Sequence, residues 1–451
     1  MENRKLLYIN HDFPPMGGPG VWRALWFTKY LIESGYDVTV VCSDRSNWCS
    51  RYDDTLLKLI PSNVKIIRIK SIFLTDLFSK VEKLLKIHKK NLINNFYMKI
   101  KWRVFQYYPE PNLWWFLKAS LHGIYLSIFR RFNCIITSGP PHISHVAGLL
   151  ISKFSSTLWI MDYRDLWTDD PGQSPTTGYQ RRLFEILERE AIKNSNVVVT
   201  VSPSWKDQLT AKYREEKDES KFHLIRNGHN IGNDLDTDFV SSKPKERLHI
   251  HFNGTPQGLS RTTHLLDALC RLKLMGISDD RLPVITYTGT TGPFKDEIQE
   301  RGLESIVHDV QSMSYQQSIE YSKKADVLLV IVNNQHPSRR GTIPAKTYEA
   351  MALGSHVFAL IPSQSDVREL LEEYGNASIC NVDDIDEIYR SLLVLITSHN
   401  NGLDKNIDLD KKNENLKKYS RRTQADQLIS LIETLISENK NSTGFSRDYA
   451  A

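Results

Sequence analysis

The segment Gly341-Thr-Ile-Pro-Ala-Lys-Thr-Tyr-Glu-Ala-Met-Ala-Leu-Gly354 decides the fold, because it joins two apolar runs typical of buried strands. Within it, Thr342 is positioned to cap a helix, Pro344 suits the first turn, and Gly354 suits the end. Strand, helix and strand in this order predict part of a parallel α/β sheet. The two apolar runs are residues 326–332 and 356–361.

The start of that helix is a candidate anion site. Free N–H groups and the helix dipole favour negative charge there, and Lys346, Arg339 and Arg340 add positive charge. Glu349, one turn further along, is a fixed acceptor for hydroxyl groups. The pattern predicts a seat for a phosphorylated, hydroxyl-rich ligand. The alternative is an ordinary capped helix in which Glu349 is merely solvated.

Length and composition indicate a globular protein of two domains. A chain of 451 residues exceeds what one ordinary hydrophobic core supports. Charged residues make up 25% and the formal net charge is only +5, so charge does not predict nucleic-acid binding. Five scattered cysteines without CxxC spacing predict a reducing compartment and no structural zinc. The sequence has neither a signal-peptide pattern nor an apolar stretch of bilayer-spanning length.

The first half of the chain alternates apolar runs with helical patterns, which predicts a doubly wound, mostly parallel sheet. The loop of residues 11–20 joins the first run to a helix expected over residues 21–33. Gly17 and Gly18 there permit close backbone approach to a ligand, although a plain turn explains them about as well. The loop lacks a full GxGxxG motif and a Walker lysine. The apolar runs are residues 6–10, 37–42, 64–70, 134–138, 157–161, 196–201 and 222–226.

The carboxyl end of one of these runs carries a polar cluster. Asp162, Arg164 and Asp165 follow residues 157–161, and the carboxyl ends of parallel strands line the ligand crevice of such sheets. These side chains are therefore candidates for binding or catalysis. The alternative is that Arg164 and Asp165 form a structural ion pair.

A second alternating series begins at residue 248 and predicts a second domain of the same class. Its first strand leads to a loop with Gly254, where Arg261 is placed to contact phosphate at a helix start. Asp234 and Asp236 match a metal-binding pair, but their polar context favours a linker turn. We expect domains over residues 1–240 and 241–415, a helix over 416–438 that packs on the first domain, and a disordered tail over 439–451.

Residues 79–103 interrupt the α/β rhythm and are strongly basic. They hold eight lysine or arginine residues against one acid, Glu82, with apolar and aromatic residues between them. A basic amphipathic segment is typical of an interfacial membrane-binding surface, here within an insertion of about residues 72–132. The alternative is a helical insertion that packs on its own domain with solvated lysines. RNA binding is disfavoured because the aromatic residues belong to no recognised module.

Several motifs follow one another in an order that resembles the family 4 glycosyltransferases of GT-B fold, over roughly residues 1–395. The resemblance implies two Rossmann-like α/β domains with a cleft between them. It also implies a retaining transfer that needs no metal and no tightly bound cofactor. The motifs are PPMGG (residues 14–18), DYRDLW (162–167), VVTVS (198–202), GT (254–255) followed by Arg261, YTGTTG (287–292), ADVLL (325–329) and IPAKTYEAMALG (343–354).

The same resemblance implies roles for individual residues. A nucleoside-diphosphate sugar would be bound mainly by the C-terminal domain, with Glu349 on the ribose hydroxyls and with Arg261 and Lys346 on the diphosphate. Stabilising charge on the departing diphosphate agrees with the chemistry of such a transfer. The resemblance implies that the nucleotide-sugar also contacts Gly17, Gly18, Gly254, Thr342, Ile343 and Pro344. Its base would lie near Val310 and Ser312. Asp162 and Asp165 would orient or deprotonate the acceptor hydroxyl.

The sequence departs from the family at Gly341. Many members carry a Glu-x7-Glu pair, and Gly341 stands where the first glutamate would precede Glu349. Backbone groups of residues 341–343 are the expected replacement. We expect a glycosyltransferase of bacterial surface-polysaccharide (lipopolysaccharide-type) synthesis, peripheral at the cytoplasmic membrane face, with a polyprenyl-linked acceptor and no nucleic-acid partner. The alternatives are another sugar-nucleotide enzyme, such as an epimerase, and a non-catalytic binding protein.

Overall fold

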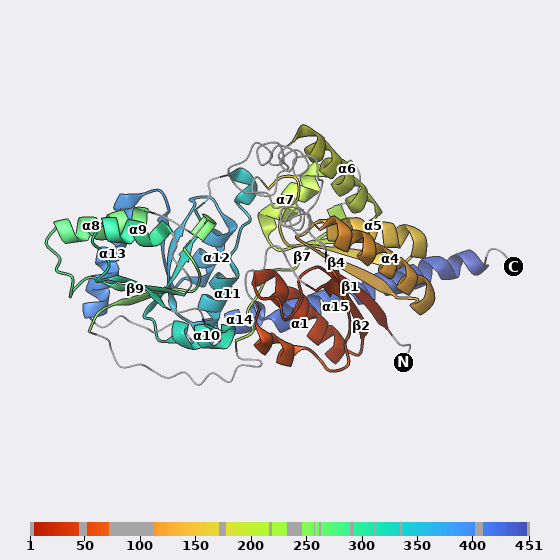
Figure 1. Ribbon diagram of the computed structural model, residues 1–451, viewed down its shortest axis with the longest axis horizontal. Helices are drawn as coiled ribbons and strands as arrows, with labels where there is room; N and C mark the ends of the chain where they lie inside the picture. The colour runs from red at the N-terminus through yellow and green to blue at the C-terminus, as the bar shows by residue number, and fades with distance from the viewer. Residues whose placement is uncertain are drawn as a thin grey trace, which may run out of the picture. The chain divides into compact units, whose positions relative to one another are not determined.

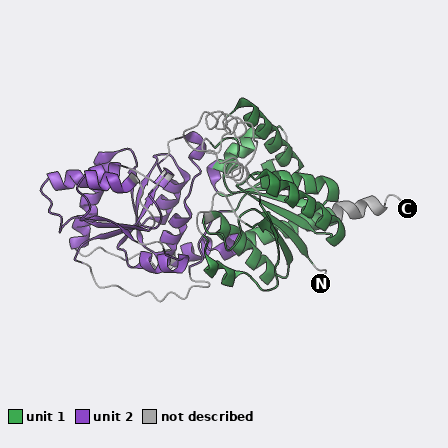
Figure 2. Ribbon diagram, in the orientation of Figure 1, with its two compact units in different colours: residues 1–201, 205–225, 425–451 green, residues 202–204, 226–424 purple. Residues whose placement is uncertain are grey.

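The computed structural model describes most of the chain in two compact units. Unit 1 contains residues 1–201, 205–225 and 425–451, and unit 2 contains residues 202–204 and 226–424 (Figure 2). Each unit has one parallel sheet with helices, which confirms the predicted doubly wound α/β class (Figure 1). The described residues are 4–44, 52–71, 112–170, 177–215, 219–231, 246–256, 258–260, 263–288, 293–310, 313–333, 336–401 and 409–448.

The sheet of unit 1 has seven parallel strands in the order β3-β2-β1-β4-β5-β6-β7. Its central strands are apolar along almost their whole length because helices cover both faces. The strands are β1 (Lys5–Asn10), β2 (Asp37–Ser43), β3 (Lys65–Ile69), β4 (Cys134–Gly139), β5 (Leu158–Tyr163), β6 (Val197–Thr200) and β7 (Phe222–Leu224).

The two large hydrophobic clusters of unit 1 include residues of different helices. One contains residues of α4, α5 and α6, and the other contains residues of α1 and of the last helix, α15, through Ala425, Leu428 and Ile432. The helices are α1 (Pro19–Glu33), α4 (Leu113–Arg130), α5 (Ile143–Ser155), α6 (Gly178–Asn194), α7 (Pro203–Lys212) and α15 (Arg421–Asp448), with short 3-10 turns η1 (Asp54–Leu59) and η2 (Glu219–Lys221).

Unit 2 repeats this architecture with six parallel strands in the order β10-β9-β8-β11-β12-β13. The strands are β8 (His249–Phe252), β9 (Val284–Thr288), β10 (Val307–Val310), β11 (Val327–Ile331), β12 (His356–Ile361) and β13 (Ala377–Asn381). The helices are α8 (His264–Leu274), α9 (Pro293–Glu300), α10 (Tyr315–Lys323), α11 (Ala345–Leu353), α12 (Asp366–Tyr374), α13 (Ile385–Asn400) and α14 (Leu409–Lys418), with η3 (Gly258–Ser260) and η4 (Pro337–Arg339).

Both sheets reverse their strand order at one point, and these points locate the sites. The reversal falls between β1 and β4 in unit 1 and between β8 and β11 in unit 2. In doubly wound sheets ligands bind beyond the carboxyl ends of the strands at this switch point. The loops there carry Gly17 and Gly18 after β1, Gly254 after β8, and Gly341 after β11.

The sequence predictions of strands agree with the structure, whereas several helix ends differ. Every apolar run named above contains a strand. However, α1 begins at Pro19, and α15 continues to Asp448, past the predicted end at residue 438. The basic residues 79–103 and the pair Asp234 and Asp236 lie outside the described residues. Among the residues that are described, no helix combines the length and apolar character that a bilayer span requires.

Candidate functional site

The start of α11 differs from the predicted capping pattern. Pro344 is the N-cap residue, in extended conformation and without a side-chain capping bond, and the helix begins at Ala345. Thr342 does not cap it, because the Thr342 N–H donates to the Arg339 carbonyl at 2.9 Å and keeps this residue in the loop after η4. The prediction for Gly354 is confirmed, since it ends the helix with φ +71°. Lys346 is therefore the second helical residue and lies in the first turn.

Glu349 lies one turn further along α11 and is buried. The Tyr315 hydroxyl hydrogen-bonds its carboxylate, and the positive charges of Arg421 and Lys346 act on it. Burial is the dominant effect and raises the pKa of Glu349 above its ordinary value. The carboxylate is thus held in a fixed position by a phenol and shielded from water.

Lys346 projects from the first turn of α11 toward the end of β8. Its ammonium lies 3.6 Å from the centroid of the Phe252 ring, a cation–π contact. Burial lowers the pKa of Lys346 to about 7, against a smaller opposing effect of Glu349. A cation in this state gains stability when a second negative charge approaches.

Gly254 makes room for this lysine. A Cβ atom at Gly254 would lie 3.0 Å from the Lys346 nitrogen and 3.4 Å from the Phe252 ring, and the residue has φ +148°. Both the space and the backbone conformation therefore favour glycine at this position. The structure thus brings together two residues predicted from the sequence, Gly254 and Lys346, through a third, Phe252, that the sequence analysis did not single out.

Tyr315 and Arg421 are further members of this cluster that sequence reasoning missed. Tyr315 is the first residue of α10, which Ser314 caps in a reciprocal box with Gln317, and it follows Val310 at the end of β10. The Ser314 cap and the Tyr-Gln that follows are a sequence signal that could have located Tyr315. Arg421 has no such signal, because it reaches the cluster only through the late segment after α14.

The late segment is fixed in unit 2 by backbone pairing. The Arg421 N–H donates to the His229 carbonyl at 2.8 Å, and the His229 N–H donates to the Tyr419 carbonyl at 3.0 Å. Tyr419 also packs against Tyr348 of α11, with ring centroids 5.5 Å apart. These contacts hold Arg421 near the Tyr315 and Glu349 pair, where its charge acts on both groups.

The loop after β1 in unit 1 contains the other predicted glycines. Gly18 is the N-cap of α1 with φ +104°, a conformation that side chains rarely adopt, and a Cβ there would meet no atom within 4 Å. Gly17 precedes it. The space around Gly18 and the start of α1 give this unit a helix N-terminus at its own switch point, as predicted.

Asp162 lies at the end of β5 and is buried in a network of partners. Its carboxylate accepts from Arg23 Nε at 2.9 Å and 3.1 Å and from Ser138 Oγ at 2.7 Å, and Arg23 Nη2 approaches it at 2.8 Å. Arg23 itself is buried on α1, with its guanidinium 4.5 Å from the Phe27 ring centroid. The carboxylate therefore joins β5, β4 and α1, and a role as base would require this ion pair to open.

Arg164 is a structural residue of the same region. It donates from Nε to the Gly139 carbonyl at 3.2 Å and also to the Pro140 carbonyl. A Cβ at Gly20 would overlap its guanidinium, so Gly20 allows the first turn of α1 to pass close by. Asp165, the next residue, is half-buried.

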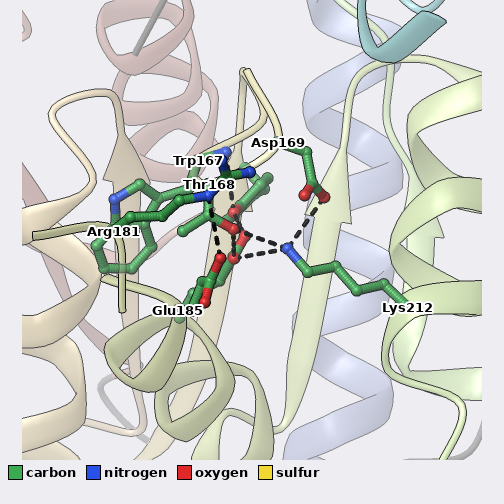
Figure 3. Close-up of polar contacts among 8 residues, drawn as sticks. Trp167, Thr168, Asp169, Arg181, Glu185 and Lys212 are labelled. Atoms are coloured by element: carbon green, nitrogen blue, oxygen red, sulfur yellow. Dashed lines mark hydrogen bonds and ion pairs between the residues drawn. The ribbon is translucent and has the colours of Figure 1, made fainter. Parts of the chain in front are cut away.

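A second buried carboxylate, Glu188 on α6, holds the loop that follows Asp165. It accepts from the hydroxyls of Tyr163 and Thr168 and from Lys212 Nζ at 2.9 Å. Figure 3 shows Lys212 of α7 reaching both Thr168 and Asp169. These contacts fix residues 163–169 on the sheet and thereby position Asp165.

The structure therefore forms two clusters from the predicted residues. Lys346, Glu349 and Gly254 lie together in unit 2, at the same switch point as Gly341, Ile343 and Pro344. Asp162 lies near the carboxyl end of β5 and Asp165 follows that strand in unit 1, next to β4 at the edge where Gly17 and Gly18 lie. Arg261 and Ser312 lie outside the described residues. Chemically, the unit 2 cluster offers a helix N-terminus, a cation and a fixed hydrogen-bond acceptor.

Comparison with solved structures identifies the fold. A glycosyltransferase from Rickettsia africae ESF-5 matches with a TM-score of 0.64 at 12% identity, covering 97% of this chain and 100% of that one. WaaG, a glycosyltransferase involved in lipopolysaccharide biosynthesis, gives 0.60 at 12%, covering 95% and 99%. A putative UDP-N-acetylglucosamine 2-epimerase from Listeria monocytogenes gives 0.55 at 11%, covering 97% and 97%. No family model and no curated sequence matches the chain.

These neighbours include GT-B glycosyltransferases and cover nearly the whole chain. TM-scores of 0.55–0.64 at 11–12% identity show a shared fold and leave the reaction open. The two Rossmann-ordered sheets of this chain, with the switch-point loops described above, have the same architecture. The chain has the GT-B fold that the order of its motifs predicts.

Proposed function

We propose that this protein is a retaining glycosyltransferase that moves a sugar from a nucleoside-diphosphate sugar to a lipid-linked saccharide in bacterial surface-polysaccharide synthesis. The observation that carries the proposal is the cluster of Lys346, Glu349 and Tyr315 at the start of α11. Its groups suit the two ends of one ligand, because an anion fits the helix start and sugar hydroxyls fit a fixed carboxylate.

In this proposal the donor binds to unit 2. Glu349, held by Tyr315, accepts hydrogen bonds from the ribose hydroxyls. Lys346 and the N-terminus of α11 contact the diphosphate, on which negative charge grows as the sugar departs. In the protein without ligand, the pKa of Lys346 is about 7. The negative charge of an approaching diphosphate raises this pKa, so the lysine takes up a proton when the donor binds. The transfer uses no metal and no tightly bound cofactor.

The acceptor binds to unit 1 in this proposal. Asp162 is committed to Arg23 and Ser138, so we assign it a positioning role. Asp165 is half-buried, in a loop that Glu188 anchors, and we assign it the contact with the acceptor hydroxyl. Gly341 adds a further element, since backbone groups of residues 341–343 take over the sugar contact that a carboxylate makes in many family members; the Thr342 N–H is not among them, because it donates to the Arg339 carbonyl.

The proposed location is the inner face of the cytoplasmic membrane, where a polyprenyl-linked acceptor resides. The support is the composition of residues 79–103, with eight basic residues and one acid. The positive charges of this segment attract the negative head groups of an anionic bilayer.

The test is donor binding and turnover by the full chain. Nucleotide-sugars are screened for release of nucleoside diphosphate in the presence of a bacterial membrane extract, and bound nucleotide is detected by thermal stabilisation. Glu349→Gln is expected to reduce kcat/KM about 100-fold, because it removes a charged acceptor at the ribose. The matched control is Glu372→Gln, an exposed carboxylate of unit 2 paired with Arg368, which should leave turnover unchanged. If no nucleoside diphosphate stabilises the protein and Glu349→Gln behaves like the control, the proposal fails.

A sugar-nucleotide epimerase is the second candidate, and the likeness to the Listeria protein favours it over other reactions. The two reactions differ in their need for an acceptor. An epimerase converts the nucleotide-sugar into an isomer without any acceptor, whereas a transferase does not. NMR of each nucleotide-sugar incubated with protein alone separates them.

A further inference from the structure

Helix α4 of unit 1 carries an exposed apolar stripe along its whole length. Leu121 is 67% exposed, Tyr125 61% and Phe129 69%. At 3.6 residues per turn the exposed residues fall on one face of the helix. Phe154, at the end of the neighbouring helix α5, is 67% exposed and adds to the same apolar surface. The exposed apolar residues of α4 are Trp114, Leu117, Leu121, Tyr125, Ile128 and Phe129.

The opposite face of α4 already provides the packing that the fold requires. Trp115, Phe116 and Ala119 are buried in the hydrophobic core of unit 1. Gly123 lets α4 approach α5 closely, because a Cβ there would overlap the Ile151 side chain. The stripe is therefore additional to core formation, and α4 is apolar on two faces. Val394 of α13 is also exposed, and a single exposed apolar side chain of this kind is common on protein surfaces.

The stripe is bordered by basic side chains. Neither α4 nor α5 contains an aspartate or a glutamate, and Lys118 and Arg131 lie on α4 or directly after it. Lys153 of α5 is also basic and lies 4.0 Å from the Glu190 carboxylate of α6. Arg131 also lines a groove of about 470 Å³ at the ends of α4 and α5, together with Ile128, Phe154 and Lys440. Apolar and aromatic residues bordered by cations are the composition of a surface that enters the head-group region of an anionic bilayer.

A second copy of the chain fits this surface less well. A symmetric contact through the stripe would place the cations of one copy against those of the other, and α4 and α5 supply no acid to compensate. A bilayer supplies both an apolar layer and negative head groups. We propose that the face formed by α4 and the end of α5 is a membrane-contact surface for anionic lipid. This inference deepens the membrane location in the proposed function, on which it rests, and names the residues that make the contact.

The experiment is binding of the full chain to vesicles, measured by co-sedimentation. Vesicles of phosphatidylglycerol mixed with phosphatidylcholine are compared with phosphatidylcholine alone. The variant L121S/Y125S/F129S is expected to bind the anionic vesicles about tenfold or more weakly, because less apolar area enters the interface. The matched control Y179S/I186S/L274S changes three residues of similar exposure elsewhere and should bind like the wild type.

Charge is tested separately. Lys118→Gln combined with Arg131→Gln is expected to reduce binding to anionic vesicles about tenfold or more and to leave the weak binding to neutral vesicles unchanged. Thermal unfolding of every variant shows whether it folds, and nucleoside-diphosphate binding shows whether unit 2 is intact. Nucleotide binding that persists while vesicle binding falls separates this inference from the proposed function.

Three results would overturn the inference. Equal vesicle binding by the stripe variant and its control would assign membrane contact to other residues. A wild-type dimer in light scattering that the stripe variant dissociates, without vesicle binding, would identify a second copy as the partner. A large fall in melting temperature of the stripe variant, without a change in vesicle binding, would mean that the chain itself covers the stripe.

Discussion

A buried carboxylate lies near the switch point of each sheet, but the two carboxylates have different partners. In unit 1, Asp162 is fully partnered by Arg23 and Ser138 at 2.7–3.1 Å. In unit 2, Glu349 has a neutral partner in Tyr315, and nearby Lys346 has a pKa lowered to about 7 by burial. The first arrangement is satisfied without a ligand. In the second arrangement, burial disfavours the charged form of Lys346, and a bound anion would stabilise that form. This property is expected of a binding site.

The largest expected effect comes from removing the partner of Asp162. Arg23→Ala removes the cation and leaves a buried carboxylate, so the free energy of unfolding should fall by about 3–5 kcal/mol. Denaturant unfolding measures this change. The double variant Arg23→Met with Asp162→Leu should be considerably less destabilised, because it leaves no buried charge. A loss below about 1 kcal/mol in Arg23→Ala would contradict a structural role for the pair.

Lys346 should show the opposite behaviour. Lys346→Met removes a cation that burial disfavours, so unfolding free energy should stay unchanged or rise slightly. Turnover of the nucleotide-sugar should fall about 100- to 1000-fold, since a charge that stabilises the departing diphosphate is lost. The pair of measurements distinguishes a functional lysine from a structural one. A destabilised variant with unchanged turnover would reverse our assignment of the two switch points.

The pH dependence of nucleotide binding sharpens the comparison further. Free Lys346 is half-protonated near pH 7, and a bound diphosphate raises its pKa. Binding at pH 8 should therefore take up protons, and affinity should fall by up to about tenfold per pH unit above 7. Calorimetry in buffers of different ionisation enthalpy measures the uptake. Lys346→Met is the control, and proton uptake that persists in it would point to another group.

A last prediction concerns the pH dependence of the free energy of unfolding. Between pH 7 and the ordinary lysine pKa of 10.5, the unfolded chain holds a proton at Lys346 that the folded chain lacks. The unfolding free energy of the wild type, relative to Lys346→Met, should therefore rise with pH over this window. Below about pH 7 both states are protonated and the difference should be constant. Urea unfolding at several pH values measures the slope, and a falling difference would contradict the lowered pKa.

The prediction of the fold from sequence succeeded because each strand has a local signature. Buried parallel strands are continuous apolar runs, and all of those named in the sequence are strands. Gly254, Lys346 and Glu349 could be named as candidates because glycine after a strand and charge at a helix start have recognisable positions, and the structure places them together. The capping prediction for Thr342 was wrong. The Thr342 N–H donates to the carbonyl of Arg339 at the end of the 3-10 turn Pro337–Arg339, and capping preferences do not include this interaction.

The residues missed from the sequence are those whose role depends on distant parts of the chain. Arg421 acts on Glu349 although 72 positions separate them, since backbone pairing with His229 fixes it there. Arg23 becomes the partner of Asp162 only when α1 lies against β5, and Phe252 meets Lys346 only when β8 and β11 are neighbours. No local pattern marks such pairs.

The sequence by itself determined the two α/β repeats and their order of strands and helices, and it predicts an anion site at the segment that begins at Gly341. These properties follow from local periodicity and residue type. Only the tertiary structure decided which charged groups are paired inside the protein and which have a shifted pKa. Burial and partner geometry set the lowered pKa of Lys346, commit Asp162 to Arg23, and leave one face of α4 apolar and exposed. The physical reason is that desolvation and charge pairing depend on neighbours that the chain brings together only on folding.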